Sequence, residues 1–277
     1  MSQPPRALPF FLRAGQGELF CMYYPPDPAL PSRGAVLYVH PFAEELNKTR
    51  RMAALQARAF AASGYAVLQP DLYGCGDSSA DFADARWQTW KQDLAHAAGW
   101  LEKKTGAALS VWGLRLGALL ALEFVRDAGR APHALYFWQP VFQGKPYLTQ
   151  FLRLGLAGKM LADAGPGSGG SAALREELRR GKTLEIGGYA LAPELALALD
   201  ELDGVRQAPP DCPLHWFELV LPATGELAPA TTRMADAWRT FGAQVNLHPL
   251  HGVAFWATAE IAECQALLAA TAAVYTP

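Results

Sequence analysis

The fold is decided by the stretch Ala108-Leu-Ser-Val-Trp-Gly-Leu-Arg-Leu-Gly-Ala-Leu-Leu-Ala-Leu122. Its first part, residues 108–112, is a short apolar run with strand character. A glycine-flanked turn over residues 113–117 follows, and an Ala/Leu-rich run with helical spacing continues to about Val125. The stretch therefore predicts a strand, a sharp turn and a helix in immediate succession.

The turn places Arg115 at its tip, with Gly113 and Gly117 two positions to either side. Small residues at these positions let a turn pack closely enough to hold the central residue in a strained conformation. A guanidinium stays protonated and carries only donors, so Arg115 is unable to attack a carbonyl group. On these five residues alone, an ordinary connection between a strand and a helix is an equal alternative.

The stretch lies within a regular alternation of strands and helices. Apolar runs at 34–40, 65–70, 108–112 and 134–139 predict strands, and residues 47–62 and 87–104 predict the helices between them, with Asn47 as a helix N-cap. This alternation indicates a mostly parallel sheet with helices on both faces. Residues 9–24 predict an antiparallel hairpin ahead of it, which gives an α/β fold with about eight strands.

The alternation stops after residue 140. Residues 147–162, 172–180 and 193–202 predict helices, and a Gly/Ser-rich segment at 165–171 interrupts them. Strands at 214–220 and 244–247 and helices at 229–241 and 259–273 then complete the chain. We therefore predict a core formed by residues 1–140 and 204–277, with residues 141–203 inserted as a helical cap or lid.

Composition excludes several classes of protein. The net charge of −2 and the lack of a Lys/Arg-dense segment argue against nucleic acid as a partner. The four cysteines are widely separated in the sequence, so we expect neither a metal site nor another cofactor. Their spacing also favours a compartment in which thiols stay reduced. Because the sequence has no signal-peptide profile and no apolar run long enough to span a membrane, we expect a cytoplasmic protein without a transmembrane segment.

Four motifs resemble those of the second of two hydrolase-like families associated with exosortase A systems. They are His40-Pro-Phe-Ala-Glu-Glu-Leu-Asn-Lys-Thr-Arg-Arg-Met, Asp71-Leu-Tyr-Gly-Cys-Gly-Asp-Ser, Gly113-Leu-Arg-Leu-Gly and Glu185-Ile-Gly-Gly-Tyr-Ala-Leu. The resemblance implies an α/β-hydrolase fold and a setting in bacteria that export exopolysaccharide. It implies no substrate, since the word hydrolase in the family name rests on the fold.

The α/β-hydrolase order of nucleophile, acid and histidine assigns a role to each of three residues. The nucleophile position, usually serine in the pattern G-x-S-x-G, holds Arg115. His251 follows the last predicted strand, where the fold places its general base, whereas His248 more simply ends that strand. Glu226, in Ala223-Thr-Gly-Glu-Leu-Ala-Pro, resembles the acid that orients this histidine. Glu218 is a second choice, and a solvated loop is the alternative for Glu226.

The segment His40-Pro41-Phe42 stands where hydrolases carry an oxyanion donor. Pro41 has no N–H, so the remaining backbone donors are those of Phe42 and Leu116. Cys75 lies in a predicted pocket loop whose other polar residues are expected to hydrogen-bond within the loop. Nothing in the sequence brings its thiol to His251, as a cysteine nucleophile would require.

Arg115, flanked by Leu114 and Leu116, has two possible roles. At a helix N-terminus it creates an anion site for a carboxylate or phosphate. Alternatively, a carboxylate from Glu44 or Glu45 pairs with it and fills the pocket. In the first case the cap would supply an apolar wall for the ligand's tail. A leucine-rich helix more often only packs against the protein core. The wall residues would be Leu148, Phe151, Leu152, Leu154, Leu156 and Met160.

Three functional hypotheses follow. The first is a protein that no longer performs serine hydrolysis and binds an acyl-like or anionic small molecule. The second is an active ester or thioester hydrolase, or an acyltransferase, that uses His251 with another nucleophile or an activated water. The third is a scaffold whose cap recruits a partner protein or a second copy of the chain.

Overall fold

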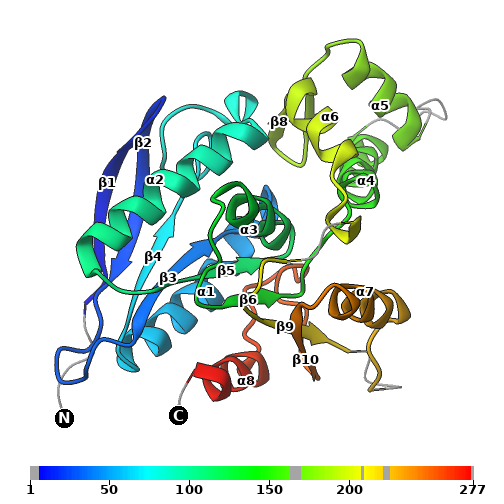
Figure 1. The fold of residues 1–277 in the computed structure, drawn as a ribbon. Helices are drawn as coiled ribbons and strands as arrows, with labels where there is room; N and C mark the ends of the chain where they lie inside the picture. Colours follow the sequence, from blue (N-terminus) through cyan, green and yellow to red (C-terminus); the bar gives the residue numbers. More distant parts are fainter. Residues whose placement is uncertain (1–5, 163–169, 207–208, 221–224, 276–277) are drawn as a thin grey trace.

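The computed structural model describes residues 6–162, 170–206, 209–220 and 225–275. Its main sheet has eight strands in the order β1-β2-β4-β3-β5-β6-β9-β10 (Figure 1). These strands are β1 (Leu8–Ala14), β2 (Gly17–Tyr24), β3 (Gly34–Val39), β4 (Tyr65–Pro70), β5 (Leu109–Leu114), β6 (Leu135–Trp138), β9 (Pro213–Leu219) and β10 (Gln244–Leu250).

The sheet is mostly parallel, as the alternation of strands and helices predicts. Strand β2 pairs antiparallel with both β1 and β4, and every other pair in the sheet is parallel. Every residue of β3 and β6 is buried, because helices cover both faces of the sheet there. The turn that holds Arg115 follows the fifth strand of this sheet, and the inserted segment follows the sixth.

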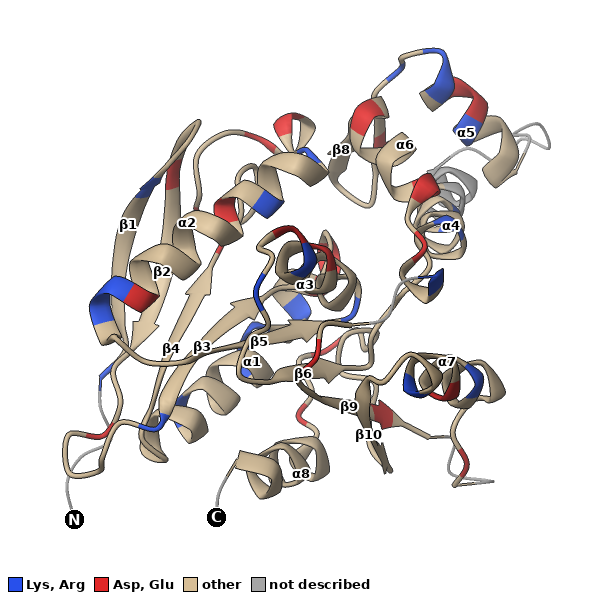
Figure 2. Cartoon of the chain, viewed as in Figure 1, with Lys and Arg blue, Asp and Glu red and all other residues tan. Residues whose placement is uncertain are grey.

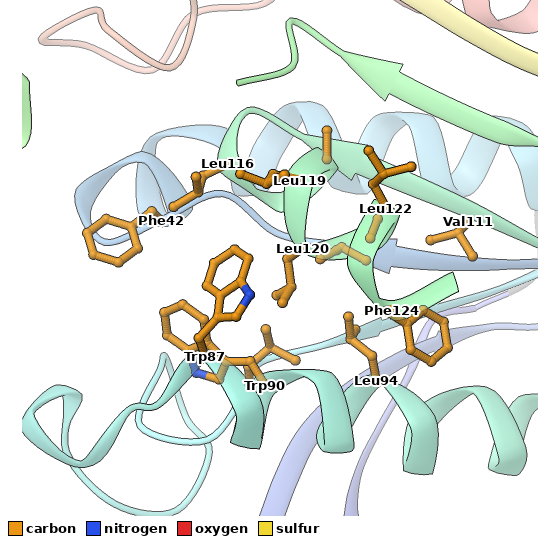
Figure 3. Packing of buried hydrophobic residues seen from close by; sticks show 14 of the residues in the cluster. Phe42, Trp87, Trp90, Leu94, Val111, Leu116, Leu119, Leu120, Leu122 and Phe124 are labelled. Carbon is orange, nitrogen blue, oxygen red and sulfur yellow. The ribbon is translucent and has the colours of Figure 1, made fainter. Parts of the chain in front are cut away.

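Helices lie on both faces of the sheet (Figure 1). Helices α2 (Trp87–Thr105), α3 (Leu116–Asp127) and α7 (Pro229–Thr240) pack on one face, and α1 (Glu44–Ala62) and α8 (Gln265–Tyr275) pack on the other. Figure 3 shows how Trp87 and Trp90 of α2 face Leu116 and Leu120 of α3. This packing fixes the position of α3, and with it the turn that precedes α3.

The inserted segment is mainly helical and lies to one side of the sheet, above α7 in the view of Figure 1. It contains α4 (Gly144–Ala162), α5 (Ser171–Arg179), a hairpin of β7 (Leu184–Ile186) and β8 (Tyr189–Leu191), and α6 (Pro193–Glu201). Two short 3-10 helices, η1 (Phe82–Asp84) and η2 (Gly204–Arg206), lie elsewhere in the chain. The three helices were predicted; the exact limits of a cap at 141 and 203 stay a prediction.

Several boundaries differ from the predicted ones. Helix α1 begins at Glu44 rather than after Asn47, because the turn at Ala43 already directs the chain into the helix. Strand β10 continues past residue 247 to Leu250, so His248 lies inside the strand rather than at its end. Most of the predicted Gly/Ser-rich loop lies outside the described residues.

The C-terminal helix α8 begins at Gln265, six positions later than the predicted 259. The preceding residues are held against α1 instead: the Cys264 N–H donates to Met52 Sδ over 3.3 Å, and Glu263 pairs with Arg51. Tertiary contacts therefore outweigh the local helical preference of this run. Among the described residues, no helix is long and apolar enough to cross a membrane.

Candidate functional site

Three strained turns lie together at the carboxyl ends of neighbouring strands. Ala43 after β3, Arg115 after β5 and Gln139 after β6 have φ angles of 49°, 55° and 41°. In this order the three strands are adjacent in the sheet. Each such conformation of a non-glycine residue costs on the order of 1–3 kcal/mol, and such strain concentrates at functional sites. This edge of the sheet is therefore the candidate site.

The turn at Arg115 has the close packing that its glycines predict. A Cβ on Gly113 would lie 2.6 Å from the Ala118 Cα, and one on Gly117 would overlap the carbonyl oxygens of Val39 and His40. Arg115 is itself the N-cap of α3, and its carbonyl oxygen accepts a 3.1 Å hydrogen bond from the Val141 N–H. A strained βα elbow is thus present, with an arginine at its tip.

The Arg115 side chain is enclosed by partners rather than free. Its Nε donates to Glu45 Oε1 over 3.2 Å, its Nη1 donates to the Gln139 carbonyl oxygen over 3.4 Å, and its Cζ lies 5.0 Å from the centre of the Trp256 ring. The side chain is only 12% exposed, and that of Glu45 only 9%. The guanidinium therefore joins all three strained turns.

Glu45, and not Glu44, is the carboxylate that pairs with Arg115. Burial raises the pKa of Glu45, and the nearby Arg115 charge and the Tyr147 hydroxyl counteract that rise. Its second oxygen, Oε2, is buried and has no hydrogen bond of normal geometry to a described residue. Glu44 is half-buried at the start of α1 and forms no ion pair within the described chain. The sequence alone left both residues open as partners.

A cavity of about 560 Å³ opens beside this ion pair, between α4, α7 and the ends of β6 and β9. Its size is typical of pockets for small organic molecules. Two guanidinium groups and mainly apolar side chains form its wall, which consists of Arg115, Pro140, Val141, Phe142, Gln143, Pro146, Tyr147, Gln150, Val205, Trp216, Ala230, Thr231, Arg233 and Met234.

His251 lies directly after the last strand, as predicted, but its side chain is exposed. It is not among the residues that line the cavity. A Cβ on Gly225 would lie 3.8 Å from the imidazole Cε1 and Nε2, so the loop that begins there runs against this ring. Glu226 follows on that loop and is exposed. Their roles as general base and orienting acid stay predictions.

Glu218, the second choice for the acid, is buried and forms a hydrogen bond between β9 and α7. The Thr231 hydroxyl lies 2.9 Å and 2.8 Å from its two carboxylate oxygens and donates to them. Burial raises the pKa of Glu218. His248 packs elsewhere, with Nε2 3.2 Å from His215 Nδ1, and burial lowers its pKa. Both side chains are held by their own neighbours.

The oxyanion segment is part of the packed interior. His40 Nδ1 lies 2.7 Å from the Pro41 carbonyl oxygen, and Nε2 accepts a 3.2 Å hydrogen bond from the Leu72 N–H. This pattern fits a neutral ring, and burial lowers the pKa of His40 accordingly. The Phe42 ring packs 5.0 Å from that of Phe151 and lies near Leu116 in Figure 3. An oxyanion role for these backbone groups stays a prediction.

Cys75 lies in a closed and rigid loop. Asp71 pairs with Arg50 over 3.1 Å and 2.8 Å and accepts the Asp77 N–H, and the Ser78 hydroxyl donates to the Asp71 carbonyl oxygen. The thiol is buried, and burial together with the Asp71 charge raises its pKa. A thiolate nucleophile is therefore disfavoured here. The self-hydrogen-bonded loop matches the sequence prediction.

The apolar wall expected from the cap is mostly core packing. Leu148, Phe151 and Leu152 are buried in the main hydrophobic cluster, and Leu154 is exposed. The side chains at positions 156 and 160 lie outside those that the structure describes. Three other residues of α4 line the cavity instead: Pro146, Tyr147 and Gln150.

Sequence reasoning also missed Gln139 and Arg233. The proline directly after Gln139, the last residue of the predicted strand 134–139, was the available signal for the first, since a residue before proline is kept out of the right-handed helical region. Arg233 had no local signal, because an arginine early in a predicted helix is normally solvated. Within the described residues, no three His, Cys, Asp or Glu side chains come together to hold a metal ion.

Solved structures share this architecture. The chain is similar to Est1E from Butyrivibrio proteoclasticus, described with bound ferulic acid, with a TM-score of 0.65 and 11% identity over 96% of each chain. A thermostable carboxyl esterase from Bacillus coagulans matches with a TM-score of 0.60 and 14% identity, over 90% of this chain and 91% of that one. At these identities, the likeness establishes the α/β-hydrolase fold.

No curated protein sequence matches the chain significantly. The family model described as serine aminopeptidase, S33, matches residues 31–180, which include the strained turns at Ala43, Arg115 and Gln139. This segment is more than half of the 277 residues. The chain therefore belongs to the serine aminopeptidase S33 family of α/β hydrolases.

Proposed function

We propose that this protein does not perform serine hydrolysis and instead binds an acyl-like or anionic small molecule in the cavity beside Arg115. The observation that carries the proposal is the Arg115–Glu45 ion pair at the tip of the elbow. A buried, paired guanidinium is unable to form an acyl-enzyme. The strained elbow is retained, while the group at its tip serves to join the neighbouring turns.

The cavity supports a binding role. It is mostly apolar and carries the cationic groups of Arg115 and Arg233, which suits an amphipathic ligand with a negative charge. Est1E, similar in fold, is described with bound ferulic acid, itself a carboxylic acid with an aromatic body. The sequence motifs around His40 and Arg115 support a further part of the proposal, that the protein serves an exosortase-linked exopolysaccharide system.

A second candidate is an active ester or thioester hydrolase that uses His251 and an activated water. One observation favours it: a Cβ on Gly225, next to Glu226, would lie 3.8 Å from the His251 ring, as expected where a loop carries an orienting acid. In that case Arg115 would bind an anionic part of the substrate.

The test is the turnover of short- and medium-chain nitrophenyl esters and acyl-thioesters by the wild type, Arg115→Ala, Arg115→Ser and His251→Ala. The proposal predicts equal, background rates for all four proteins. Arg115→Ser also stays inactive. The substitution leaves Glu45 buried without its partner, and it brings no general base close enough to activate the new serine hydroxyl. Activity in the wild type that falls about a hundredfold or more in His251→Ala would instead establish the second candidate.

A further inference from the structure

The two arginines that line the cavity differ in how their charge is used. Arg115 is neutralised by Glu45, hydrogen-bonded to Gln139 and covered by the Trp256 ring. Arg233 of α7 is exposed and forms no ion pair or hydrogen bond with any residue in the described part of the chain. Its guanidinium is thus the one of the two whose donors are available to a ligand.

The acidic groups around Arg233 are already engaged. Among the described residues that line the cavity, none is an aspartate or a glutamate. Asp236, one turn further along α7, pairs with Arg239 over 3.0 Å, and Glu218 accepts the hydrogen bond that the Thr231 hydroxyl donates. Basic and acidic positions alternate along α7 in Figure 2, with the first basic position nearest the helix start. Arg233 therefore leaves an uncompensated positive charge at the cavity.

The first turn of α7 also lines the cavity. Ala230 and Thr231 of its first turn line the cavity, and the N-cap, Ala228, has no side chain that caps the helix. The Glu218 carboxylate already accepts hydrogen bonds from the Ala228 backbone and the Thr231 hydroxyl at this helix start, so Arg233 supplies the unpaired positive charge at the cavity. Much of the remaining cavity wall is apolar and includes Val141, Phe142 and Trp216.

We infer that the ligand is a monocarboxylate with an extended apolar chain, whose carboxylate pairs with Arg233 while its chain lies against Phe142, Trp216 and Met234. This inference rests on the proposed binding function and names its ligand class. A single free guanidinium matches one negative charge, whereas a phosphate monoester would bring close to two. A neutral alcohol of the same length would use the apolar wall and leave Arg233 unpaired.

The test is isothermal titration of the full-length protein with octanoate and with 1-octanol, the neutral compound of equal chain length. Four proteins are compared: the wild type, Arg233→Gln, Lys103→Gln and Ala230→Trp. Lys103 is exposed on α2, away from the cavity, so its substitution is a control for the loss of one positive charge. Tryptophan at position 230, an exposed site on α7, fills part of the cavity without altering the core.

The wild type is expected to bind octanoate about tenfold or more tightly than 1-octanol, as a charge-assisted pair implies. Arg233→Gln should remove this difference without changing the affinity for 1-octanol, Lys103→Gln should match the wild type, and Ala230→Trp should weaken both ligands. Unchanged octanoate affinity in Arg233→Gln would overturn the inference, as would the absence of saturable octanoate binding.

The two proposals fail in different ways. In one outcome, octanoate and 1-octanol bind equally well to the wild type and to Arg233→Gln, and Ala230→Trp binds neither. This result would refute the role of Arg233 and leave the cavity as a binding site. Hydrolysis of nitrophenyl octanoate that depends on His251 would refute the binding-only function, and the effect of Arg233→Gln on octanoate affinity would still decide the ligand class.

Discussion

Arg115 Nε lies 3.2 Å from Glu45 Oε1, and this contact joins two turns of the same strained form. Arg115 has φ and ψ angles of 55° and −122°, and Ala43, two residues before Glu45, has 49° and −124°. Each turn leads from a buried parallel strand into a helix. The contact therefore joins the start of α1 to the start of α3 at the elbow.

Glu45→Gln is expected to destabilise the fold, because it leaves the Arg115 charge buried without an opposite charge. Removal of one partner of a buried pair costs about 3–5 kcal/mol, and at 12% and 9% side-chain exposure we expect the lower end of that range. Urea denaturation measures the change. The double variant Glu45→Gln, Arg115→Met should recover part of the loss; a single variant as stable as the wild type would contradict the importance of the pair.

Gly117→Ala tests the close packing of the elbow. Because the added Cβ would overlap the carbonyl oxygens of Val39 and His40, we expect a loss of about 3 kcal/mol or more, if the variant folds at all. Gly99→Ala is the matched control, since a Cβ at that position on α2 meets nothing within 4 Å. The control should gain up to about 1 kcal/mol. Equal stabilities of the two variants would refute the packing argument.

Asp93→Asn tests a buried carboxyl that the proposed binding site does not use. Burial raises the pKa of Asp93 from 3.8 to about 6, and Oδ2 accepts the Tyr73 N–H over 2.9 Å. Because the folded pKa is the higher one, the unfolded chain releases this proton first, so stability falls as pH rises from about 4 to 6.

The amide variant should therefore be more stable than the wild type at pH 7.5, by about 1–3 kcal/mol, and should match it more closely near pH 4. Urea denaturation across this pH range provides the measurement, with Glu185→Gln on the exposed side of β7 as the control. A wild type that is the more stable protein at pH 7.5 would contradict the assigned shift.

The native thiols should resist modification. All four cysteines are buried and unpaired, and burial raises the pKa of Cys21 to about 12 and that of Cys212 to about 11. Thiolate is the reactive form, so Ellman's reagent at pH 8 should label none of them until denaturant is added. Rapid labelling of native Cys75 would show an accessible thiol in the loop after β4 and would reopen the question of a cysteine nucleophile.

The sequence predicted the sheet and the elbow because local patterns determine them. The strands are predicted by fully apolar runs such as those of β3 and β6. The elbow is predicted by the glycines at 113 and 117. The β7–β8 hairpin was missed, although Gly187-Gly188, with φ angles of 57° and 85°, forms the kind of turn that two glycines favour.

Partners of charged side chains were harder to predict. Whether Glu44 or Glu45 meets Arg115 depends on where α1 begins, and the strain at Ala43 shifts that start by several residues relative to the predicted N-cap. Arg233 lines the cavity only because the fold brings α7 to the same cavity as α4 and β9. Such contacts arise from the tertiary arrangement and have no periodicity in the sequence.

In the proposed function, Arg115 and its partner Glu45 replace nucleophilic catalysis at the elbow. The most direct measurement is intact-mass spectrometry of the wild type and His251→Ala after incubation with a fluorophosphonate, which modifies activated hydroxyl nucleophiles. Both proteins should keep their unmodified mass if no activated hydroxyl nucleophile is present. A stoichiometric adduct on the wild type that is absent from His251→Ala would reveal a nucleophile activated by this histidine and would contradict the proposed function.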